Sequence, residues 1–487
     1  MIVVMGIGLY TVRAILHLLG VVDYGIYNVV GGVVSMFTFL NGTLSTSSQR
    51  YFSIELAKGD TDRLNKWFCL NVSTFSIFIL IFLVIAETAG LWFVNTQMTI
   101  PQERLFAANV VYQLSIVSFC IHFFSIPYNA LIIAHEKMSA FAYISIVDAL
   151  FKLVIVFILS IISWDKLIVY GLLMLLSSCG ITSSYIIYNR IHFTESKFRP
   201  YWNRKEIFEI LGFSGWHFMG TFSFMIRSQG INILLNLFFN PVINAARAIA
   251  YQIYHAVSQL SNNFFTAVKP QIYKSYANKE YDELYKLINR STVMSTFLVS
   301  IITFPILANT PYILGLWLKE VPEYSIIFTQ LVLINGLIDS TGGPTIASAL
   351  ATGKIRKYQQ CISTLIILNL PLSYIALSLG AEPQFTLLIS IIISTITALV
   401  RGYFLQPMIG FPYLRYFLLL SKISAVSATV WLISYYIFYG NVDSFFTLII
   451  SILTISACII SLYYIFLINK SDKIILLKTI RRYVTHK

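Results

Sequence analysis

Residues 26–49, IYNVVGGVVSMFTFLNGTLSTSSQ, carry small or polar side chains at alternating spacings of three and four within an otherwise apolar run. The residues of this stripe are Asn28, Gly31, Ser35, Thr38, Gly42, Ser45 and Gln49. Such spacing places them on one face of a helix. Because the rest of the surface is apolar, as in a helix that meets lipid, we expect the stripe to face a neighbouring helix or a water-filled cavity.

A second stripe of the same kind follows about 220 residues later and consists of Tyr251, His255, Ser258, Asn262 and Lys269. The segments after the two stripes also match, with Ala57, Asp60, Asp62, Leu64 and Lys66 against Ala277, Glu280, Asp282, Leu284 and Lys286. Another match, at an offset of 217, pairs Pro127, Ala130, Ala134 and Lys137 with Pro344, Ala347, Ala351 and Lys354. The chain is therefore predicted to contain two copies of one membrane unit.

The composition excludes a soluble domain. Of the 487 residues, 57% are hydrophobic and only 11% are charged, and the mean hydropathy is +0.75. Water would meet more apolar surface than folding could hide, so a polytopic membrane protein is predicted. The net charge of +13 is spread over short loops and is not gathered on one domain, so nucleic acid is not expected as a partner. The five cysteines have no paired spacing that would indicate a disulfide framework or a metal site.

A bilayer core of ~30 Å needs about 20 helical residues per crossing. By this measure the sequence contains fourteen apolar segments, at 2–22, 26–48, 67–94, 105–133, 141–162, 167–189, 208–238, 242–267, 292–318, 325–351, 359–380, 384–406, 415–438 and 443–468. We predict an all-α integral membrane protein with two pseudo-symmetric six-helix lobes around a central cavity, plus two extra C-terminal helices. The predicted parts are an N-terminal lobe (1–190), a cytoplasmic linker (191–207), a C-terminal lobe (208–406), and two further helices with a basic tail (407–487).

Basic residues are distributed unequally between the two sides of these segments. With both termini in the cytoplasm, 27 of the 34 lie in cytoplasmic loops or at the span ends beside them, and Arg401 is counted among these. The opposite loops hold only Arg104, Lys166 and Lys319. The positive-inside rule therefore predicts cytoplasmic termini and an even number of spans.

Four basic residues remain inside spans, and three acids accompany them. They are Arg13, Lys152, Arg227 and Arg247, with Glu87, Asp148 and Asp339. Each base would cost roughly 2.5 to 3.5 kcal/mol at a lipid-facing bilayer centre, so a cavity or a partner is expected. Asp148 and Lys152 stand one helical turn apart, which allows a mutually neutralising structural pair. For the arginines the alternatives are a role in a cavity, and helix packing or snorkelling.

The predicted substrate-binding residues of the cavity are Arg13, Arg50, Arg227, Arg247, Lys269, Asn28, Ser35, His255 and Asn262, and the predicted gating or coupling residues are Asp148, Lys152, Asp339 and Glu87. Guanidinium groups in a membrane cavity suit an anion with phosphate oxygens, because the planar fork offers paired donors and stays charged. The histidines show no spacing of a metal site, and residues 348–355 lack the glycine and hydroxyl of an ATP-binding phosphate loop. No catalytic residue, metal or cofactor is predicted.

Several of these residues together resemble a known family. They are Arg13, the run Leu19 to Tyr27 (LGVVDYGIY), Gln49, Arg50, Tyr51 and Phe52, and the loop Ala57, Lys58, Gly59, Asp60. The sequence resembles bacterial polysaccharide flippases of the O-antigen type, in the multidrug, oligosaccharidyl-lipid and polysaccharide (MOP) exporter superfamily. The resemblance covers the whole chain. One departure is the short N-terminus, which lacks the cytoplasmic lead usual before the first span.

The resemblance implies a non-enzymatic protein of the bacterial inner membrane. Its substrate would be an undecaprenyl-diphosphate-linked oligosaccharide, a unit of O-antigen, capsule or exopolysaccharide, moved to the periplasmic leaflet by alternating access. Membrane lipids and other polysaccharide assembly proteins are the implied partners. Three alternatives stay open: a flippase for a lipid-linked peptidoglycan precursor, a cation-coupled multidrug antiporter of the same superfamily, and a membrane polymerase or ligase. An antiporter would be expected to show a carboxylate-rich cavity, and a polymerase or ligase would need a sizeable periplasmic loop.

Overall fold

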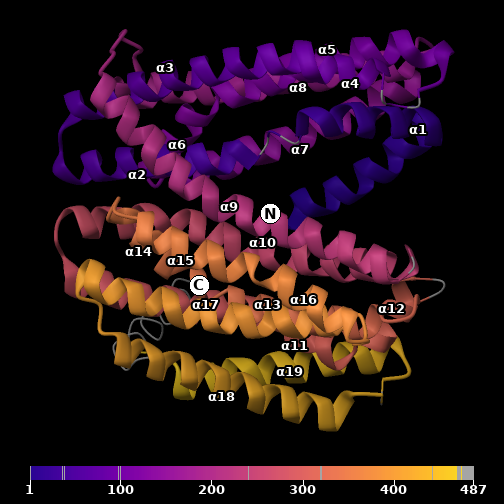
Figure 1. The fold of residues 1–487 in the computed structure, drawn as a ribbon, viewed down its shortest axis with the longest axis vertical. Coiled ribbons are helices and arrows are strands. Elements are labelled where there is room, and N and C mark those ends of the chain that lie inside the picture. Colours follow the sequence, from indigo (N-terminus) through magenta and orange to yellow (C-terminus); the bar gives the residue numbers. More distant parts are fainter. Residues whose placement is uncertain are drawn as a thin grey trace, which may run out of the picture. The chain divides into compact units, whose positions relative to one another are not determined.

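In a computed structural model the chain is helical almost throughout (Figure 1). The structure describes residues 2–35, 37, 39–96, 98, 100–239, 241–318, 321–440, 442–468 and 473, and no strand occurs among them. The prediction of an all-α protein is confirmed. The chain divides into two compact units, Met1–Phe218 and Met219–Lys487.

The first unit contains α1 (Ile2–Ser35), α2 (Phe39–Lys58), α3 (Thr61–Ile85), a π-helical turn (Ala86–Gly90), α4 (Leu91–Thr96), a 3₁₀ turn (Gln102–Arg104), α5 (Leu105–Phe124), α6 (Ile126–Ala134), α7 (Met138–Ile161), α8 (Lys166–His192), a second 3₁₀ turn (Thr194–Ser196) and the start of α9 (Arg204–Phe238). The second unit contains the rest of α9, α10 (Pro241–Ala277), α11 (Tyr281–Ala308), α12 (Thr310–Trp317), α13 (Ser325–Asp339), α14 (Gly342–Ala351), α15 (Arg356–Ile367), α16 (Asn369–Ser378), α17 (Phe385–Ile409), α18 (Tyr413–Phe438) and α19 (Phe445–Phe466).

Backbone conformation shows the two copies that the sequence predicts. Gly59 after α2 and Lys279 after α10 both have positive φ, 73° and 60°, and they stand 220 residues apart. Glu136 and Gly353, 217 residues apart, also share this left-handed conformation, with φ of 59° and 73°. A left-handed residue after a helix C-terminus ends the helix and reverses the chain. The same turns therefore recur at the offsets read from the sequence.

Gly20 separates the first two predicted spans. It has φ 77° and ψ 169°, so α1 consists of two helical segments that meet at a kink. Glycine adopts this region without steric strain, whereas another residue would be strained there. The predicted end of the first span at residue 22 thus agrees with the structure to within two residues.

Four predicted spans are broken near a proline. Ser125 separates α5 from α6, Asn309 separates α11 from α12, residues 340 and 341 separate α13 from α14, and Leu368 separates α15 from α16. The prolines Pro127, Pro305, Pro344 and Pro371 lie within four residues of these breaks. Proline lacks an N–H group and its ring clashes with the carbonyl four residues earlier, which interrupts a helix.

Ten helical segments of the described chain are long and apolar enough to cross a membrane: Thr61–Thr96, Gln102–Ala134, Met138–Ile161, Lys166–His192, Tyr281–Ala308, Ser325–Ala351, Arg356–Ser378, Phe385–Ile409, Tyr413–Phe438 and Phe445–Phe466. The protein is therefore a multi-pass membrane protein. Helices α2 and α10 carry more polar side chains than these segments, and they overlap the second predicted span of each copy. Membrane helices that carry polar faces must turn them toward protein or water.

The last two helices belong to the core of the second unit. Ile423 and Val426 of α18, and Ile455 and Ile459 of α19, are buried with Val299 of α11 in one cluster. Hydrogen bonds join the same helices, because the Ser300 and Tyr463 hydroxyls lie 2.9 Å apart and the Asn309 amide donates to Ser451 at 2.9 Å. In a membrane such polar contacts hold helices together where lipid offers no alternative partner.

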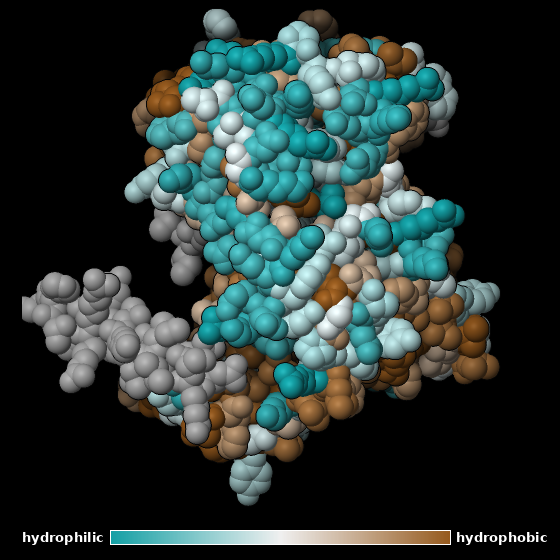
Figure 2. All heavy atoms as spheres, turned by 90° about the vertical axis from the view of Figure 1, so that its left-hand side faces the viewer, coloured by the Kyte–Doolittle hydropathy of each residue, from teal (hydrophilic) through white to brown (hydrophobic). Residues whose placement is uncertain are grey.

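In the first unit hydrophilic residues gather at the end where the α2–α3 connection lies, and in the second unit at the end where the α10–α11 connection lies (Figure 1 and Figure 2). In the first unit Lys58 and Arg63 are about half exposed, with 51% and 54% of their side-chain surface accessible. In the second unit Lys286 and Glu283 form an exposed pair at 2.8 Å. These exposed basic residues lie on connections that the charge count assigns to the cytoplasmic side.

At the opposite end of the first unit, Arg104 links two carboxylates. Its guanidinium donates to Asp23, three residues after the Gly20 kink, and to Asp165 at 2.6 Å. Asp165 also caps α8, since it accepts from the Leu167 N–H at 3.0 Å. Burial alone would raise the pKa of Asp165, but the hydrogen bonds from Arg104 and from the backbone outweigh burial and lower it. Through these two carboxylates, Arg104 therefore connects the kink in α1 to the start of α8.

We predict that Asp165→Asn lowers the melting temperature of the purified protein at pH 7, because asparagine keeps the cap but loses the ion pair, a change of about 1 kcal/mol. A carboxylate whose pKa is lower in the folded than in the unfolded protein stabilises the fold at pH values above its unfolded-state pKa. This stabilisation is lost as the pH falls through its folded-state pKa. The difference in melting temperature between the two proteins should therefore shrink below about pH 4. A pH-independent difference would contradict the ionic explanation.

Candidate functional site

Two arginines of the second unit are buried inside the helical bundle. Arg227 on α9 is 7% exposed, and its guanidinium lies 4.6 Å from the centre of the Phe224 ring. Arg247 on α10 is 4% exposed, lies 4.4 Å from the Tyr251 ring centre, and donates to the Asn232 side chain of α9. Spacings of three and four residues within each helix bring these partners onto one face.

Neither arginine has a carboxylate partner among the described residues, since no Asp or Glu oxygen lies within 4.0 Å of either guanidinium there. The Nε of Arg247 is buried without a hydrogen-bond partner. Cation–π contacts offset only part of the desolvation of a buried charge. Two buried cations that lack a carboxylate partner among the described residues indicate a site that attracts an anion.

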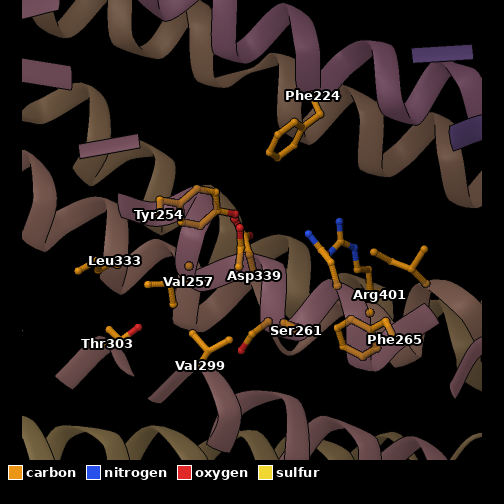
Figure 3. A pocket seen from close by; sticks show the side chains of 16 residues that line it. Phe224, Tyr254, Val257, Ser261, Phe265, Val299, Thr303, Leu333, Asp339 and Arg401 are labelled. Atoms are coloured by element: carbon orange, nitrogen blue, oxygen red, sulfur yellow. The ribbon is translucent and has the colours of Figure 1, made fainter. Parts of the chain in front are cut away.

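A cavity of about 260 Å³ lies within the second unit, and one of its walls is Phe224, whose ring contacts the Arg227 guanidinium. Helix α10 lines it with Tyr254, Val257, Ser258, Ser261, Asn262 and Phe265; the other walls include Phe224 of α9, Val299 and Thr303 of α11, Leu333, Gly336 and Asp339 of α13, Gly343 and Ile346 of α14, and Arg401 of α17. In Figure 3 the side chains of Tyr254, Asp339 and Arg401 point toward the same open space, with Phe224 across from them.

The cavity results from how α10 packs on the broken helix α13–α14. The Tyr254 ring lies against Gly336 and the Phe265 ring against Gly343, so closely that a methyl group on either glycine would overlap the ring. Between these two contacts α10 presents the small side chains of Ser258 and Ser261. Because helices held apart by aromatic rings cannot close over small side chains, space remains at the break.

The break supplies polar groups to the cavity, and neighbouring helices stabilise its backbone. The Ser340 carbonyl accepts from Ser295 of α11 at 2.9 Å, and the Thr341 carbonyl accepts from Tyr416 of α18 at 3.4 Å. Asp339, in the last turn of α13, accepts from the Asn335 amide at 2.8 Å. Buried carbonyls at a helix end need such partners.

Arg401 approaches the break from α17. Its guanidinium lies against Gly342, where any side chain would overlap it, and its Nε is buried without a hydrogen-bond partner. Asp339 and Arg401 both line the cavity, yet they are not within ion-pair distance of each other. The cavity therefore offers one carboxylate acceptor and one guanidinium donor that do not neutralise each other directly.

The structure assigns different surroundings to the predicted cavity residues. Asn262 lines the cavity, His255 is exposed on the same helix, and Lys269 is partly buried further along it. Arg50 is 8% exposed and lies between two rings of the first unit, 4.9 Å from the centre of Tyr51 and 5.0 Å from that of Phe213. The side chains of Arg13, Asn28 and Ser35 lie outside the described part of the structure, so their predicted roles stay predictions.

Of the four predicted gating or coupling residues, only Asp339 lines the cavity. The Lys152 ammonium donates to Asp148 at 2.7 Å, so the pair predicted from spacing is present on α7. Glu87 is exposed in the π-helical turn and accepts from Gln113 at 3.0 Å. Within the described residues no group of three or more His, Cys, Asp or Glu side chains could hold a metal ion.

Sequence reasoning missed Arg401. It was counted among the charges in cytoplasmic loops or at the span ends beside them, and in the structure it lies within α17, eight residues before the helix ends, and lines the cavity. The position of Arg401 inside the apolar segment 384–406 could have revealed this. The repeat places Asp339 217 residues after His122, and both lie in the last turn of the helix before the break of their copy.

Solved structures with similar folds are transporters. A MATE family multidrug resistance transporter of the MOP superfamily, in an outward-facing conformation, superposes with a TM-score of 0.68 at 13% identity, covering 84% of this chain and 94% of that one. A MATE structure in a straight conformation gives a TM-score of 0.70 at 14% identity, with the same coverage. A MOP superfamily transporter from Pyrococcus furiosus, described as having a binding pocket of reverse polarity, gives 0.65 at 13% identity over 84% and 93%.

The fold is therefore that of the MOP superfamily transporters. Residues 1–275 match the family described as "Polysaccharide biosynthesis protein", and the chain belongs to this family. No curated protein matches the sequence.

We predict that exchanging the charges of the α7 pair preserves function. The double variant Asp148→Lys with Lys152→Asp keeps two opposite charges at one-turn spacing, so it should support more polysaccharide production in cells than Asp148→Ala or Lys152→Ala. Export is measured in cells with protein abundance determined by immunoblot. If the double variant is as inactive as the single ones, direct contact of these side chains with cargo or ion is the better explanation.

Proposed function

We propose that this protein translocates an undecaprenyl-diphosphate-linked oligosaccharide from the cytoplasmic to the periplasmic leaflet of the bacterial inner membrane by alternating access. The observation that carries the proposal is the pair of buried arginines, Arg227 and Arg247, which have no carboxylate partner among the described residues. A diphosphate would supply the missing counter-charge. Membership of a polysaccharide biosynthesis family and a transporter fold support the same conclusion.

The chemistry of the arginines favours phosphate oxygens over other anions of similar charge. A guanidinium stays ionised at any accessible pH and offers parallel N–H donors that match two phosphate oxygens. In a partly desolvated site the attraction between fixed cations and an anion exceeds that in water. Arg247 has a free Nε donor for this purpose. A cationic drug would be repelled by the same pair, which disfavours the antiporter alternative.

Both termini are proposed to lie in the cytoplasm, because the basic connections would then face that side. Lys58 and Arg63 exemplify this side in the first unit, and Lys286 does so in the second. Other polysaccharide assembly proteins are proposed partners, since the translocated unit has to be polymerised or ligated after it reaches the periplasmic leaflet.

We predict that cells lacking the gene accumulate lipid-linked repeat units on the cytoplasmic leaflet. The experiment follows the accessibility of these lipids to a membrane-impermeant glycan-oxidising reagent in spheroplasts and in inverted vesicles. The units should be protected in spheroplasts and reactive in inverted vesicles, and plasmid-borne protein should restore the normal distribution. Unchanged amounts and sidedness of lipid-linked units would contradict the proposed function.

We predict that Arg247→Ala reduces export at least tenfold, a loss of ~1.4 kcal/mol of transition-state stabilisation, while Arg247→Lys retains part of it because lysine keeps the charge but loses the paired donors. Arg63→Ala, at an exposed position, is the matched control and should export normally. Protein abundance and melting temperature are measured for each variant. Full export by Arg247→Ala at native abundance would show that this arginine only anchors α10 to α9.

A further inference from the structure

We propose that the cavity bordered by Phe224, Tyr254, Asp339 and Arg401 binds one sugar residue of the lipid-linked oligosaccharide, namely the residue next to the diphosphate. The inference rests on the proposed function and specifies how the substrate would be recognised. Its basis is the mixed chemistry of the cavity walls and the position of the cavity beside the buried arginines.

The charges of the cavity argue against a bare ion as its ligand. Asp339 would repel an anion, whereas Arg401 would repel a metal cation or an ammonium group. The formal charges of the two side chains cancel. A neutral molecule that both donates and accepts hydrogen bonds can use both groups, and a polyhydroxylated sugar ring is such a molecule.

The polar groups of the cavity are available to a ligand. The Arg401 Nε is buried without a hydrogen-bond partner, and the one hydrogen bond that Asp339 makes leaves further acceptor positions free. Asn262 is exposed and adds an amide that both donates and accepts. A buried unpaired donor is unfavourable, so a ligand hydroxyl that accepts from Arg401 would be recognised with specificity.

The apolar walls suit the other surface of a sugar. Phe224, Tyr254 and Phe265 present aromatic rings to the cavity, and Phe224 is 44% exposed, so part of its ring is accessible. The C–H faces of a pyranose pack on aromatic rings while its hydroxyls bind polar side chains at the edge, the usual pattern of a polar ligand in a mostly apolar pocket. A volume of about 260 Å³ is large enough for one sugar ring.

The cavity adjoins the proposed diphosphate site through shared residues. Phe224 lines the cavity and carries the Arg227 guanidinium on its ring at 4.6 Å. Tyr254 lines the cavity, and its ring centre lies 5.9 Å from that of Tyr251, whose ring centre lies 4.4 Å from the Arg247 guanidinium. A ligand that places its diphosphate at the arginines would therefore place the attached sugar in the cavity.

The test uses the full-length purified protein and an oligosaccharide freed of lipid and phosphate by mild acid hydrolysis of the lipid-linked precursors. Binding is measured by saturation-transfer NMR. We expect transfer to be strongest at the reducing-end sugar, and we expect Asp339→Asn and Arg401→Gln each to raise the Kd at least tenfold. Asp282→Asn and Arg415→Gln, at exposed positions of the same unit, are the matched controls and should bind like the wild type.

Three results would overturn the inference. The first is no saturation transfer with the wild type, and the second is equal transfer with the wild type and with the cavity variants. The third is that sodium chloride raises the melting temperature of the wild type but not of Asp339→Asn, while the oligosaccharide changes neither. If the charge variants melt at a lower temperature than the wild type, Phe224→Leu decides, because an exposed ring can be removed without a buried void. Its loss of binding supports the inference, and its normal binding overturns it.

The binding test addresses the sugar site and the leaflet test addresses the proposed function, so either proposal can be refuted without the other. Normal sidedness of lipid-linked units in cells lacking the gene would refute the proposed function whatever the cavity binds. Misplaced units in those cells, together with normal export by Asp339→Asn and Arg401→Gln, would leave the proposed function standing and refute the sugar site. Inorganic pyrophosphate serves as the second probe, and its binding should be lost in Arg247→Ala but kept in Asp339→Asn.

Discussion

A helix that breaks inside a membrane must find partners for the backbone groups that the break releases, because lipid offers none. In the first unit, carbonyl groups near the break between α5 and α6 accept hydrogen bonds from α8. Thr182 donates to the Ile121 carbonyl at 3.2 Å, and Asn189 donates to the Tyr128 carbonyl at 3.1 Å. The second unit uses Ser295 and Tyr416 at its break between α13 and α14. Side chains from other helices thus make both interruptions possible, and the helices around each break are held in place by them.

The break in the second unit determines where polar chemistry can exist within the bundle. It places Asp339 at a helix end, and Gly342 and Gly343 there leave room for the Arg401 guanidinium and the Phe265 ring. The cavity follows from these contacts, since α10 rests on aromatic rings at two points and cannot close between them. In the first unit the equivalent position before the break is His122, which is close enough to Asp148 and Lys152 to interact with both charges. Each unit therefore has an ionisable side chain before its break.

The buried arginines add a second polar region to the same unit. Arg227 and Arg247 lie on rings of their own helices, which shields them from lipid but leaves their charge without a carboxylate partner among the described residues. A structural ion pair would have needed an acid at hydrogen-bonding distance. Together, the arginines and the cavity form adjoining surfaces, one cationic and one neutral and polar, joined through Phe224 and Tyr254. Such an arrangement suits an amphipathic ligand whose charged group is attached to an uncharged polar one.

Local chemistry in the sequence determined the helices, their number and the repeat. Apolar segments of membrane length, the prolines at the breaks and the offsets of 220 and 217 all act over short distances or by simple periodicity, so they could be read without coordinates. The Asp148–Lys152 pair could be read for the same reason, because one helical turn joins its members. What only the tertiary structure decided is which side chains from distant helices share a space. Arg401 looked like a charge at a span end, and it meets Asp339 and Tyr254 only because α17, α13 and α10 pack around one break, an arrangement set by the shapes of glycine notches and aromatic rings.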